Sequence, residues 1–466
     1  MATPRIAAAA ATLLESFGFL TAQQVVSILF ETAKDLGAPG ADAVYGHGVL
    51  DLEAAMSATG AASIPPGNAG SGGGGGLAFA ALTIGGAVAY LMRDKQEELQ
   101  KTVLVDSYGR AFQFDLPGRM SVRDAGLSIF ALQQRQQATF DHVLLNRSEN
   151  SLTRVSYGQR ETGLYRHTSA DRQFERFVSL LHRTETPDAV YLLGLNADLS
   201  ANFGALSRGS ADRAPVRFVS TKLFSTPALG YSSIGSSFMH GWSGPRLEHR
   251  FGVSVIDDQE QNGLASNSIL YESSLSQEQY RLGWQLGALV EDGSLFGGSS
   301  GGPFSVDSAS TYFLGINGTL DLTPRVRVLG GYFRGFSAVA DSRDSLLSDF
   351  SSLRSEGYAL GLVADRVFSD RGSFGVSYSR PLQSSSGSAV LTVPVSQDRS
   401  TGAVSFDASG VDFDSASRER VIETYYNYKL RPRSSLFIHF SHTANPRSNL
   451  AADRERTVFV GWRRTL

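Results

Sequence analysis

Three side chains near the C-terminus have types that could carry hydrolytic chemistry. His439 and Ser441 are separated by one residue, and His442 follows directly. A histidine base must reach a serine nucleophile through a direct hydrogen bond, and a third group must orient the imidazole. On an extended strand two residues at this spacing are about 7 Å apart, and no acidic residue that could orient the imidazole is evident from the sequence. We therefore expect these side chains to line a lumen or a loop end.

Two other groups of potential ligands have ordinary interpretations. Asp341, Asp344 and Asp349 lie in one polar stretch, but their spacing matches no calcium-binding loop, so a solvated, charged loop is expected. His47 lies between two glycines and is expected to belong to a closing turn. The chain contains no cysteine, which excludes disulfides, thiolate metal sites and a cysteine nucleophile. The sequence therefore predicts no metal site and no cofactor.

The composition narrows the class of protein. With 466 residues the chain is long enough for two or three units. Its 49 glycines, 28 phenylalanines and 16 tyrosines, with only 19% charged residues, argue against a helix bundle. A net charge of -3 gives no electrostatic case for a nucleic-acid partner. The mean hydropathy of -0.11 excludes a polytopic helical membrane protein but permits a β-barrel, whose hydropathy averages out along each strand.

The elements that position the C-terminal residues are strands. Residues 421–430, 434–442 and 456–466 each alternate apolar and polar side chains, so that Ile438 lies on the face opposite His439. This period of two predicts strands with one apolar and one polar face. The same alternation recurs from Ser151 onward, in segments of about ten residues that suit a tilted transmembrane strand. It is clearest in residues 280–290, 312–320, 358–364 and 374–378.

These strands predict a mainly β fold with a C-terminal antiparallel β-barrel of the transmembrane type. Tyrosine and tryptophan lie near strand ends, and the opposite faces carry glycine, serine, asparagine and charge. Turns are short at one end, whereas Ser337–Glu356 and Gln397–Arg418 are long and polar, as expected for periplasmic turns and extracellular loops. A soluble all-β domain is the alternative, because alternation alone does not distinguish a face that meets lipid from one that meets a core.

Residues 1–57 differ from the remainder and read as helices. An alanine-rich helix begins near Pro4, and Thr21 with Gln24 predicts a capping box that opens a second helix. That helix carries an apolar stripe and ends at Gly37. A secretory signal is a poor alternative, because Glu15 interrupts the apolar run and no convincing cleavage site follows.

The N-terminal residues carry a family resemblance. Met1-Ala2-Thr3-Pro4, followed by a helix of small residues, resembles the tail of the nucleophile motif of subtilisin-like serine peptidases, Gly-Thr-Ser-Met-Ala-Thr-Pro. Tyr45-Gly46-His47-Gly48 and the residues after it resemble the closing element and last helix of that family. The resemblance implies that the catalytic serine would directly precede Met1, with the aspartate and histidine of the triad further upstream.

Several expectations follow from this resemblance. Residues 1–57 would be the C-terminal helices of an incomplete peptidase domain, and the chain as written would be inactive. Translation would have been assigned to an internal methionine, or the gene would be truncated. We also expect these residues not to fold stably alone, because their apolar stripes would be exposed without the missing peptidase sheet.

The middle of the chain connects the two parts. Residues 58–76 are rich in glycine, serine and proline and predict a flexible linker. Within residues 77–100 the apolar run Leu77–Met92 predicts a helix shorter than the about 20 residues needed to cross a bilayer. It could be membrane-embedded or interfacial, docked against a partner domain, or inserted in the barrel mouth. Residues 101–150 form a junction, with a hairpin around residues 107–109 and a short helix over residues 125–137.

Residues 151–466 resemble the C-terminal translocator barrel of autotransporters. The resemblance implies about twelve strands, the outer membrane of a Gram-negative-type cell, and a passenger on the periplasmic or extracellular side. Leu466 stands where the family has an aromatic residue. The implied partners are outer-membrane lipid and the barrel-assembly machinery. A peptide substrate is implied only for a longer parent, a secreted or surface serine-type endopeptidase. A non-enzymatic outer-membrane pore or adhesin and a soluble all-β binding module are the alternative functions.

Overall fold

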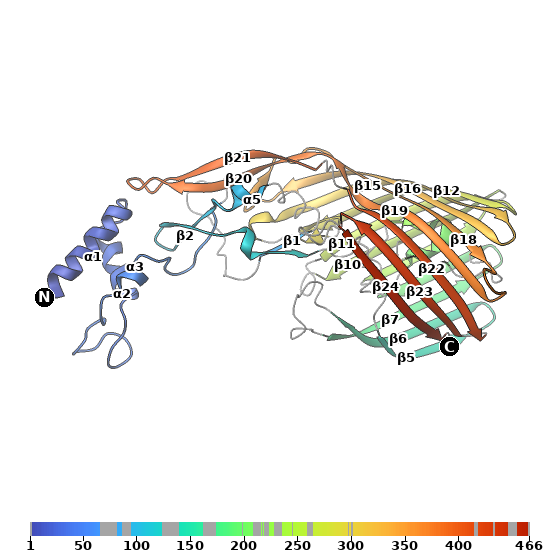
Figure 1. Cartoon of the computed structure of the whole chain (residues 1–466), viewed down its shortest axis with the longest axis horizontal. Helices are drawn as coiled ribbons and strands as arrows, with labels where there is room; N and C mark the ends of the chain where they lie inside the picture. The colour runs from blue at the N-terminus through green and yellow to red at the C-terminus, as the bar shows by residue number, and fades with distance from the viewer. Residues whose placement is uncertain are drawn as a thin grey trace.

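The protein is described here by a computed structural model in which helices, a group of short strands and one large sheet follow one another (Figure 1). The N-terminal helices lie at the end of the molecule opposite the C-terminus. The structure describes residues 2–65, 82–85, 95–123, 139–161, 174–197, 199–207, 216, 218, 223–227, 235–244, 246–258, 264–296, 298–299, 302–413, 418–431, 434–445 and 454–464.

The N-terminal unit contains α1 (Ala2–Ser16), α2 (Ala22–Glu31) and α3 (Leu52–Ala55). The predicted capping box is confirmed: the Gln24 N–H donates to the Thr21 hydroxyl at 3.2 Å, and the Thr21 N–H donates to the Gln24 side chain at 2.9 Å. A small core joins the three helices, and its buried members are Ala9, Leu13, Leu20, Val25, Ile28, Leu29 and Ala55. Among the described residues, no helix is both long enough and apolar enough to span a bilayer.

The N-terminal unit also exposes apolar side chains. Val44 is 79% exposed, and the other large exposed apolar residues of the unit are Ile6, Leu14, Val26, Phe30, Tyr45, Val49 and Leu52. The apolar stripe predicted on the second helix is not among them, because Val25, Ile28 and Leu29 are buried in the small core of the unit. The expectation that this stripe is exposed is therefore wrong, and the exposed apolar side chains are others. That residues 1–57 do not fold stably alone is a statement about their free energy of unfolding, and it stays a prediction.

The junction contains the predicted hairpin and a strand where a helix was expected. β2 (Val103–Val105) and β3 (Ala111–Gln113) pair antiparallel across a turn in which Gly109 has a φ of 78°. β1 (Leu82–Gly85) pairs in parallel with β4 (Met120–Arg123). The predicted apolar helix is thus wrong for residues 82–85, where β-branched side chains favour a strand and glycine disfavours a helix. The rest of Leu77–Met92 and the predicted helix at residues 125–137 lie outside the described residues.

The beginning of the predicted linker is fixed in place. The Thr59 N–H donates to the Asp106 carboxylate at 3.1 Å, and Ser63 forms a β-bridge with Val105. Ala62 and Ile64 on either side of that bridge are buried. The prediction of a flexible linker is therefore wrong here, because backbone pairing and apolar burial together hold these residues. Residues 66–76 lie outside the described part.

In the part of the chain that the structure describes, the large sheet has 15 strands, and every neighbouring pair is antiparallel. This exceeds the about twelve strands predicted by family analogy, and the first strand begins at Thr139, inside the predicted junction. Within the described residues β5 and β24 are the two edges, and no pairing joins them. In order, the strands are β5 (Thr139–Arg147), β6 (Ser151–Glu161), β7 (Phe174–Glu185), β8 (Ala189–Leu195), β9 (Ser236–Ser243), β10 (Leu247–Asp258), β11 (Leu264–Ser276), β12 (Tyr280–Asp292), β15 (Val306–Thr323), β16 (Val326–Asp341), β18 (Leu353–Asp365), β19 (Gly372–Ser386), β22 (Arg420–Arg431), β23 (Ser434–Ala444) and β24 (Arg454–Arg464).

The connections have the predicted asymmetry, although the long ones are more structured than expected. The turns at residues 186–188, 277–279 and 324–325 lie at one end, whereas the longest connections, 196–235 and 387–419, lie at the other. The long connections contain β13 (Ser294–Leu295), β14 (Gly298–Ser299), η8 (Gly302–Phe304), β17 (Leu347–Ser348), β20 (Ser388–Gln397) and β21 (Val404–Asp412). The predicted polar loops are therefore partly strand, and β20–β21 forms a hairpin that reaches toward α1 (Figure 1).

One hydrophobic core joins the junction to these long connections. We call residues 59–65 and 95–123 the cap; they include α5 (Gln96–Leu99) and η2 (Pro117–Arg119). The cap lies between the N-terminal helices and the large sheet (Figure 1). Its buried apolar residues pack with those of β13, η8, β17, β20 and β21, and the cluster includes Ala62, Ile64, Leu99, Leu104, Leu116, Leu295, Phe296, Phe304, Leu346, Leu347, Ala389, Leu391, Val393, Val411 and Phe413.

Candidate functional site: the two faces of the large sheet

The outer face of the large sheet is apolar and exposed. On β12 the side chains of Tyr280, Leu282, Trp284, Leu286 and Val290 are between 40% and 52% exposed. The neighbouring strand β15 continues this band with Tyr312, Leu314, Ile316 and Leu320. The alternation in the sequence therefore predicted the two faces, and the apolar face is the one that points away from the sheet interior.

Aromatic side chains accompany this band near the end that carries the short turns. Trp242 stacks on His249 with ring centroids 5.2 Å apart, and the His249 Nδ1 lies 2.8 Å from the Tyr271 hydroxyl. On β24 the Trp462 indole donates to the Ser434 hydroxyl at 2.7 Å. Amphipathic rings in such positions are typical of the interface between lipid tails and water.

The inner face is polar, and an ion-pair network lies at its centre. Glu272 on β11 is completely buried, and Arg281 on β12 is 2% exposed. One Glu272 oxygen accepts from Arg281 and, at 3.0 Å, from Arg250. The other accepts from the Gln285 amide at 2.6 Å and from the Gly204 N–H at 2.7 Å. Four donors around one carboxylate are the arrangement that a buried charge requires.

The Gly204 contact belongs to a segment that folds against the inner face. We call residues 199–207 and 223–227, together with Val216 and Phe218, the inward segment; it includes η4 (Ser200–Asn202) and η5 (Gly204–Leu206) of the β8–β9 connection. Arg281 donates to the Gly204 carbonyl at 2.5 Å, and Gln285 donates to the Ser225 carbonyl at 2.8 Å. The segment is therefore bound to the wall through its backbone.

Glycines of the wall make room for the inward segment. A Cβ at Gly331 would lie 2.0 Å from the Leu223 carbonyl oxygen, and one at Gly361 would lie 3.0 Å from the Phe218 ring. Phe218 and Phe224 are buried there against Tyr425 of β22. The inner face thus accommodates this segment both by its shape and by its charged and polar side chains.

The substitution Gly331→Ala is expected to displace the inward segment. The added methyl would overlap the Leu223 carbonyl, and overpacking of this kind costs about 1–3 kcal/mol. The adjacent Gly330→Ala is the matched control, because a Cβ there meets only the Ala359 oxygen, at 3.9 Å. Urea midpoints of the two refolded variants measure the difference. Equal midpoints would show that the inward segment does not press against Gly331.

The histidine and serine singled out in the sequence lie on the inner face of β23. His439 and Ser441 are 3% and 2% exposed. The His439 Nε2 lies 3.1 Å from the Glu423 carboxylate, so the expectation that no acid orients this imidazole is wrong. Within the described residues the His439 Nδ1 has no hydrogen-bond partner, so Ser441 and His439 do not form a nucleophile–base pair. The residues line the inner face, as predicted.

Glu423 could have been found by aligning two predicted strands. β22 and β23 pair antiparallel, and Glu423 is opposite Ser441 in that register. His442 lies on the other face of β23, where it is half-buried.

The remaining candidate ligands do not come together around a site. The Asp349 N–H donates to the Asp341 carboxylate at 2.9 Å, and Asp344 is exposed. Over the described residues no group of three or more His, Asp or Glu side chains is arranged to hold a metal ion. The His47 ring stacks on Phe30 with centroids 3.9 Å apart.

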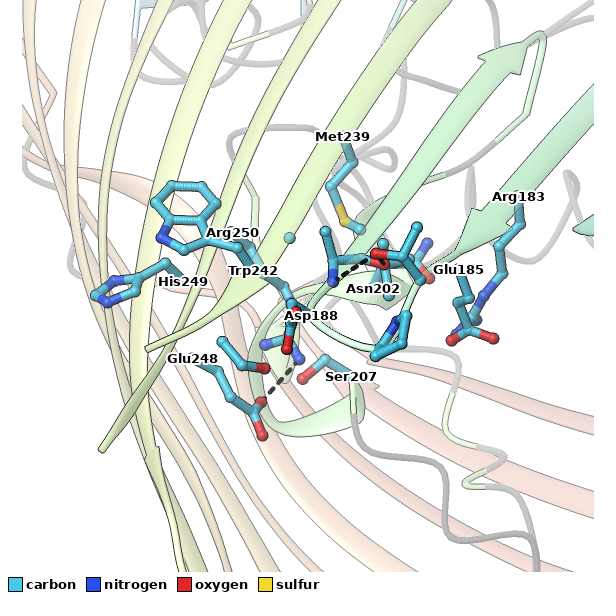
Figure 2. Close-up of a pocket in the computed structure, with 16 residues that line it drawn as sticks. Arg183, Glu185, Asp188, Asn202, Ser207, Met239, Trp242, Glu248, His249 and Arg250 are labelled. Carbon is cyan, nitrogen blue, oxygen red and sulfur yellow. Dashed lines mark hydrogen bonds and ion pairs between the residues drawn. The ribbon is translucent and has the colours of Figure 1, made fainter. Parts of the chain in front are cut away.

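A pocket of about 310 Å³ lies between the inward segment and β7–β10. Figure 2 shows Asn202 and Ser207 near the middle of the view, with Arg183 and Glu185 to their right and Trp242 and His249 to their left. Arg250 pairs with Glu248 at 3.1 Å, and Arg183 pairs with Glu185. Both arginine side chains are thus already paired with carboxylates. The lining of the pocket therefore indicates no particular class of ligand.

The chain is therefore mainly β, with one large antiparallel sheet whose exposed face is apolar, whereas its N-terminal unit is helical. Residues 1–48 match the model of the Subtilase family. Over 54 residues the chain is 46% identical to Serotype-specific antigen 1 of Mannheimia haemolytica, a match that covers 12% of this chain and 6% of that protein.

Solved structures similar to the chain include an outer-membrane protein and a porin. OmpT of Vibrio cholerae is 9% identical, with a TM-score of 0.39 over 70% of this chain and 94% of that one. OprB of Pseudomonas putida is 10% identical, with a TM-score of 0.37 over 70% and 91%. An anion-selective porin from Comamonas acidovorans is 11% identical, with a TM-score of 0.36 over 69% and 82%.

Proposed function

We propose that this chain is the C-terminal part of a subtilisin-like autotransporter serine endopeptidase. In this proposal the barrel anchors or translocates the peptidase passenger at the outer membrane. The observation that carries the proposal is the orientation of the large sheet, whose outer face exposes apolar side chains while its inner face buries polar ones.

This orientation favours lipid over water around the sheet. A soluble antiparallel sheet packs its apolar face against a core and leaves its polar face wet. Here the bands of β12 and β15 point outward, and no second layer among the described residues covers them. Burying one leucine-sized side chain contributes roughly 1.5–3 kcal/mol. A band of such residues is therefore a strong reason to place the sheet in a bilayer, with lipid and the barrel-assembly machinery as partners.

The peptidase assignment rests on the subtilase match at residues 1–48. Because Met1-Ala2-Thr3-Pro4 resembles the tail of that family's nucleophile motif, the proposal assigns peptide hydrolysis to a subtilase domain to which residues 1–48 contribute helices. The inner-face residues His439 and Ser441 do not provide a substitute, since the hydrogen bond that would activate the serine is not formed in the described structure. Peptide substrates accordingly belong to the longer protein.

The structure gives less support to the alternative of an adhesin or an open pore. The long connections bury their apolar residues against the cap, which leaves fewer of them for an external partner. The inward segment lies against the centre of the inner face, where an open channel would run. Both features suit an anchor better than a receptor or a wide pore.

The test is to recover the native protein from fractionated membranes and to measure its intact mass, N-terminal sequence and gel mobility. We expect it in the outer-membrane fraction, with faster mobility before heating than after, and with the catalytic residues of a subtilase in the same polypeptide. Recovery in the aqueous phase with unchanged mobility on heating would contradict the membrane assignment. A membrane protein without those catalytic residues would contradict the peptidase assignment alone.

A further inference from the structure

The N-terminal unit contacts the tip of the β20–β21 hairpin, far along the sequence. A Cβ at Gly18, between α1 and α2, would lie 3.1 Å from the Arg399 carbonyl oxygen. The ring of Phe19 lies over Gly402, where a Cβ would be only 2.9 Å from it. Gly402 has a φ of 75°, so glycine is favoured there by its backbone as well as by space. The hairpin and the helices are therefore in close contact.

The tip of the hairpin has a fixed shape. The Asp398 carboxylate accepts from the Ser400 hydroxyl at 2.6 Å and from the Thr401 N–H at 2.8 Å. These hydrogen bonds hold the pKa of Asp398 at about 2, well below its usual range, so the carboxylate is charged at neutral pH. A tip closed by its own side chains presents a defined surface to the helices.

Arg110 joins the N-terminal helices to the cap. Its side chain is completely buried and pairs with Asp106 at 2.8 Å. The guanidinium donates to the Ala55 carbonyl at 2.5 Å and to the Ser57 carbonyl at 2.9 Å, at the end of α3. It also lies 5.3 Å from the centroid of the Phe17 ring, at the end of α1. One buried cation thus contacts the C-terminal ends of both α1 and α3.

Gln397 joins the cap to the hairpin. Its amide nitrogen donates to the Gly109 carbonyl at 2.6 Å, and its amide oxygen accepts from the Ala111 N–H at 2.9 Å. The same nitrogen donates to the Gly402 carbonyl at 2.9 Å, across the hairpin. The β2–β3 turn is therefore hydrogen-bonded to the end of β20, next to the tip of the β20–β21 hairpin.

From these contacts we infer that the cap and the β20–β21 hairpin form a rigid mount, which holds the peptidase domain in one place at the loop end of the barrel. The identity of the mounted domain rests on the proposed function, whereas the mount itself rests on the contacts of Arg110, Gln397, Gly18 and Gly402. The exposed apolar residues Val26, Phe30 and Val44 are not used by these contacts. The passenger is accordingly held by a second surface of the barrel in addition to its covalent connection.

A cysteine pair tests the mount directly, because the chain contains no other cysteine. A Cβ at Gly18 would lie 3.9 Å from the Ser400 Cα, which keeps the two Cα atoms within the about 6.8 Å that a disulfide allows. The variant is G18C/S400C in the full chain, folded in outer-membrane vesicles. The matched control is G40C/S400C, because a Cβ at Gly40 meets nothing within 4 Å. The readout is the rate of disulfide formation under mild oxidation.

We expect G18C/S400C to close at least about tenfold faster than G40C/S400C, because a held contact raises the effective concentration of the two thiols. Equal rates would overturn the mount. Membrane fractionation and heat-dependent mobility of the same samples separate the two proposals. A barrel that fails these assays contradicts the proposed function, while a membrane-embedded barrel with equal closure rates contradicts the mount alone.

A third substitution tests the role of Gln397 without altering the cysteine pair. In the G18C/S400C background, Gln397→Ala is expected to reduce the closure rate toward that of G40C/S400C, since three hydrogen bonds to the cap and the hairpin are lost. Ser396→Ala is the matched control, because the neighbouring Ser396 is exposed. A Gln397→Ala variant that closes as fast as the Ser396→Ala variant would show that the cap does not fix the hairpin.

Discussion

Replacing Leu286 and Leu314 together by arginine is expected to prevent stable assembly of the barrel into a membrane. The two side chains are directly opposite each other on β12 and β15 and are 52% and 49% exposed on the outer face. An arginine on the lipid face of a barrel costs about 2–4 kcal/mol at the bilayer midplane. Two of them would remove much of the stability of an ordinary domain, which is about 5–15 kcal/mol. The measurement is the fraction of protein that is membrane-embedded and migrates faster before heating than after.

The same double substitution tests whether the outer face meets lipid or water, because its effect on stability differs strongly between the two. At exposed positions of a soluble protein, substitutions usually change stability by less than about 0.5 kcal/mol. Val44→Arg in the N-terminal unit serves as a control, since Val44 is 79% exposed but lies outside the large sheet. Normal assembly of the L286R/L314R variant would place the outer face in water and reject the membrane assignment.

The second large effect is expected from Glu272→Gln. This change keeps the shape of the side chain but removes the charge that matches Arg281 and Arg250. Breaking a buried ion pair by removing one partner costs about 3–5 kcal/mol. The inward segment also loses a charged acceptor for the Gly204 N–H. We expect a lower urea midpoint, together with higher conductance of the reconstituted barrel as the inward segment detaches from the wall.

Glu248→Gln is the matched control for this substitution. Glu248 pairs with the same Arg250, but its side chain is 30% exposed, and exposed pairs contribute about 0–1 kcal/mol. A midpoint shift in Glu248→Gln as large as that in Glu272→Gln would mean that general charge balance, not the buried network, sets the stability. Unchanged conductance in Glu272→Gln would show that the buried network does not hold the inward segment in its position.

Local patterns predicted the parts of the fold that depend on neighbouring residues. The alternation over residues 280–290 predicted a strand and its two faces, because side chains on a strand point alternately to opposite sides. The capping box at Thr21 and the turn at Gly109 depend on a few consecutive residues and were likewise predictable. The apolar run around Leu82–Gly85 was misread, because hydropathy in a short run does not separate helix from strand.

The parts that could not be predicted depend on contacts between distant residues. Gln397 and Ala111 are 286 positions apart and meet only because the hairpin returns to the cap. Glu423 and His439 also meet across two strands, but these strands are neighbours in the sequence, so aligning them would have found this pair. The inward segment carries no periodic signal of its own, and the glycines that accommodate it, such as Gly331, look like any other glycine in the sequence. The predicted number of strands rests on family analogy, and that analogy contains no information on how the strands of this chain pair.

The number of strands has a consequence for any closure of the large sheet. Within the described residues the sheet has 15 strands and neighbours alternate in direction, so β5 and β24 run the same way. A seam between them would be a parallel pair in an otherwise antiparallel wall, with slanted hydrogen bonds that are slightly less stable per residue. Residue for residue, such a seam would hold less strongly than any pair of neighbouring strands in the described sheet, so the wall would separate there first.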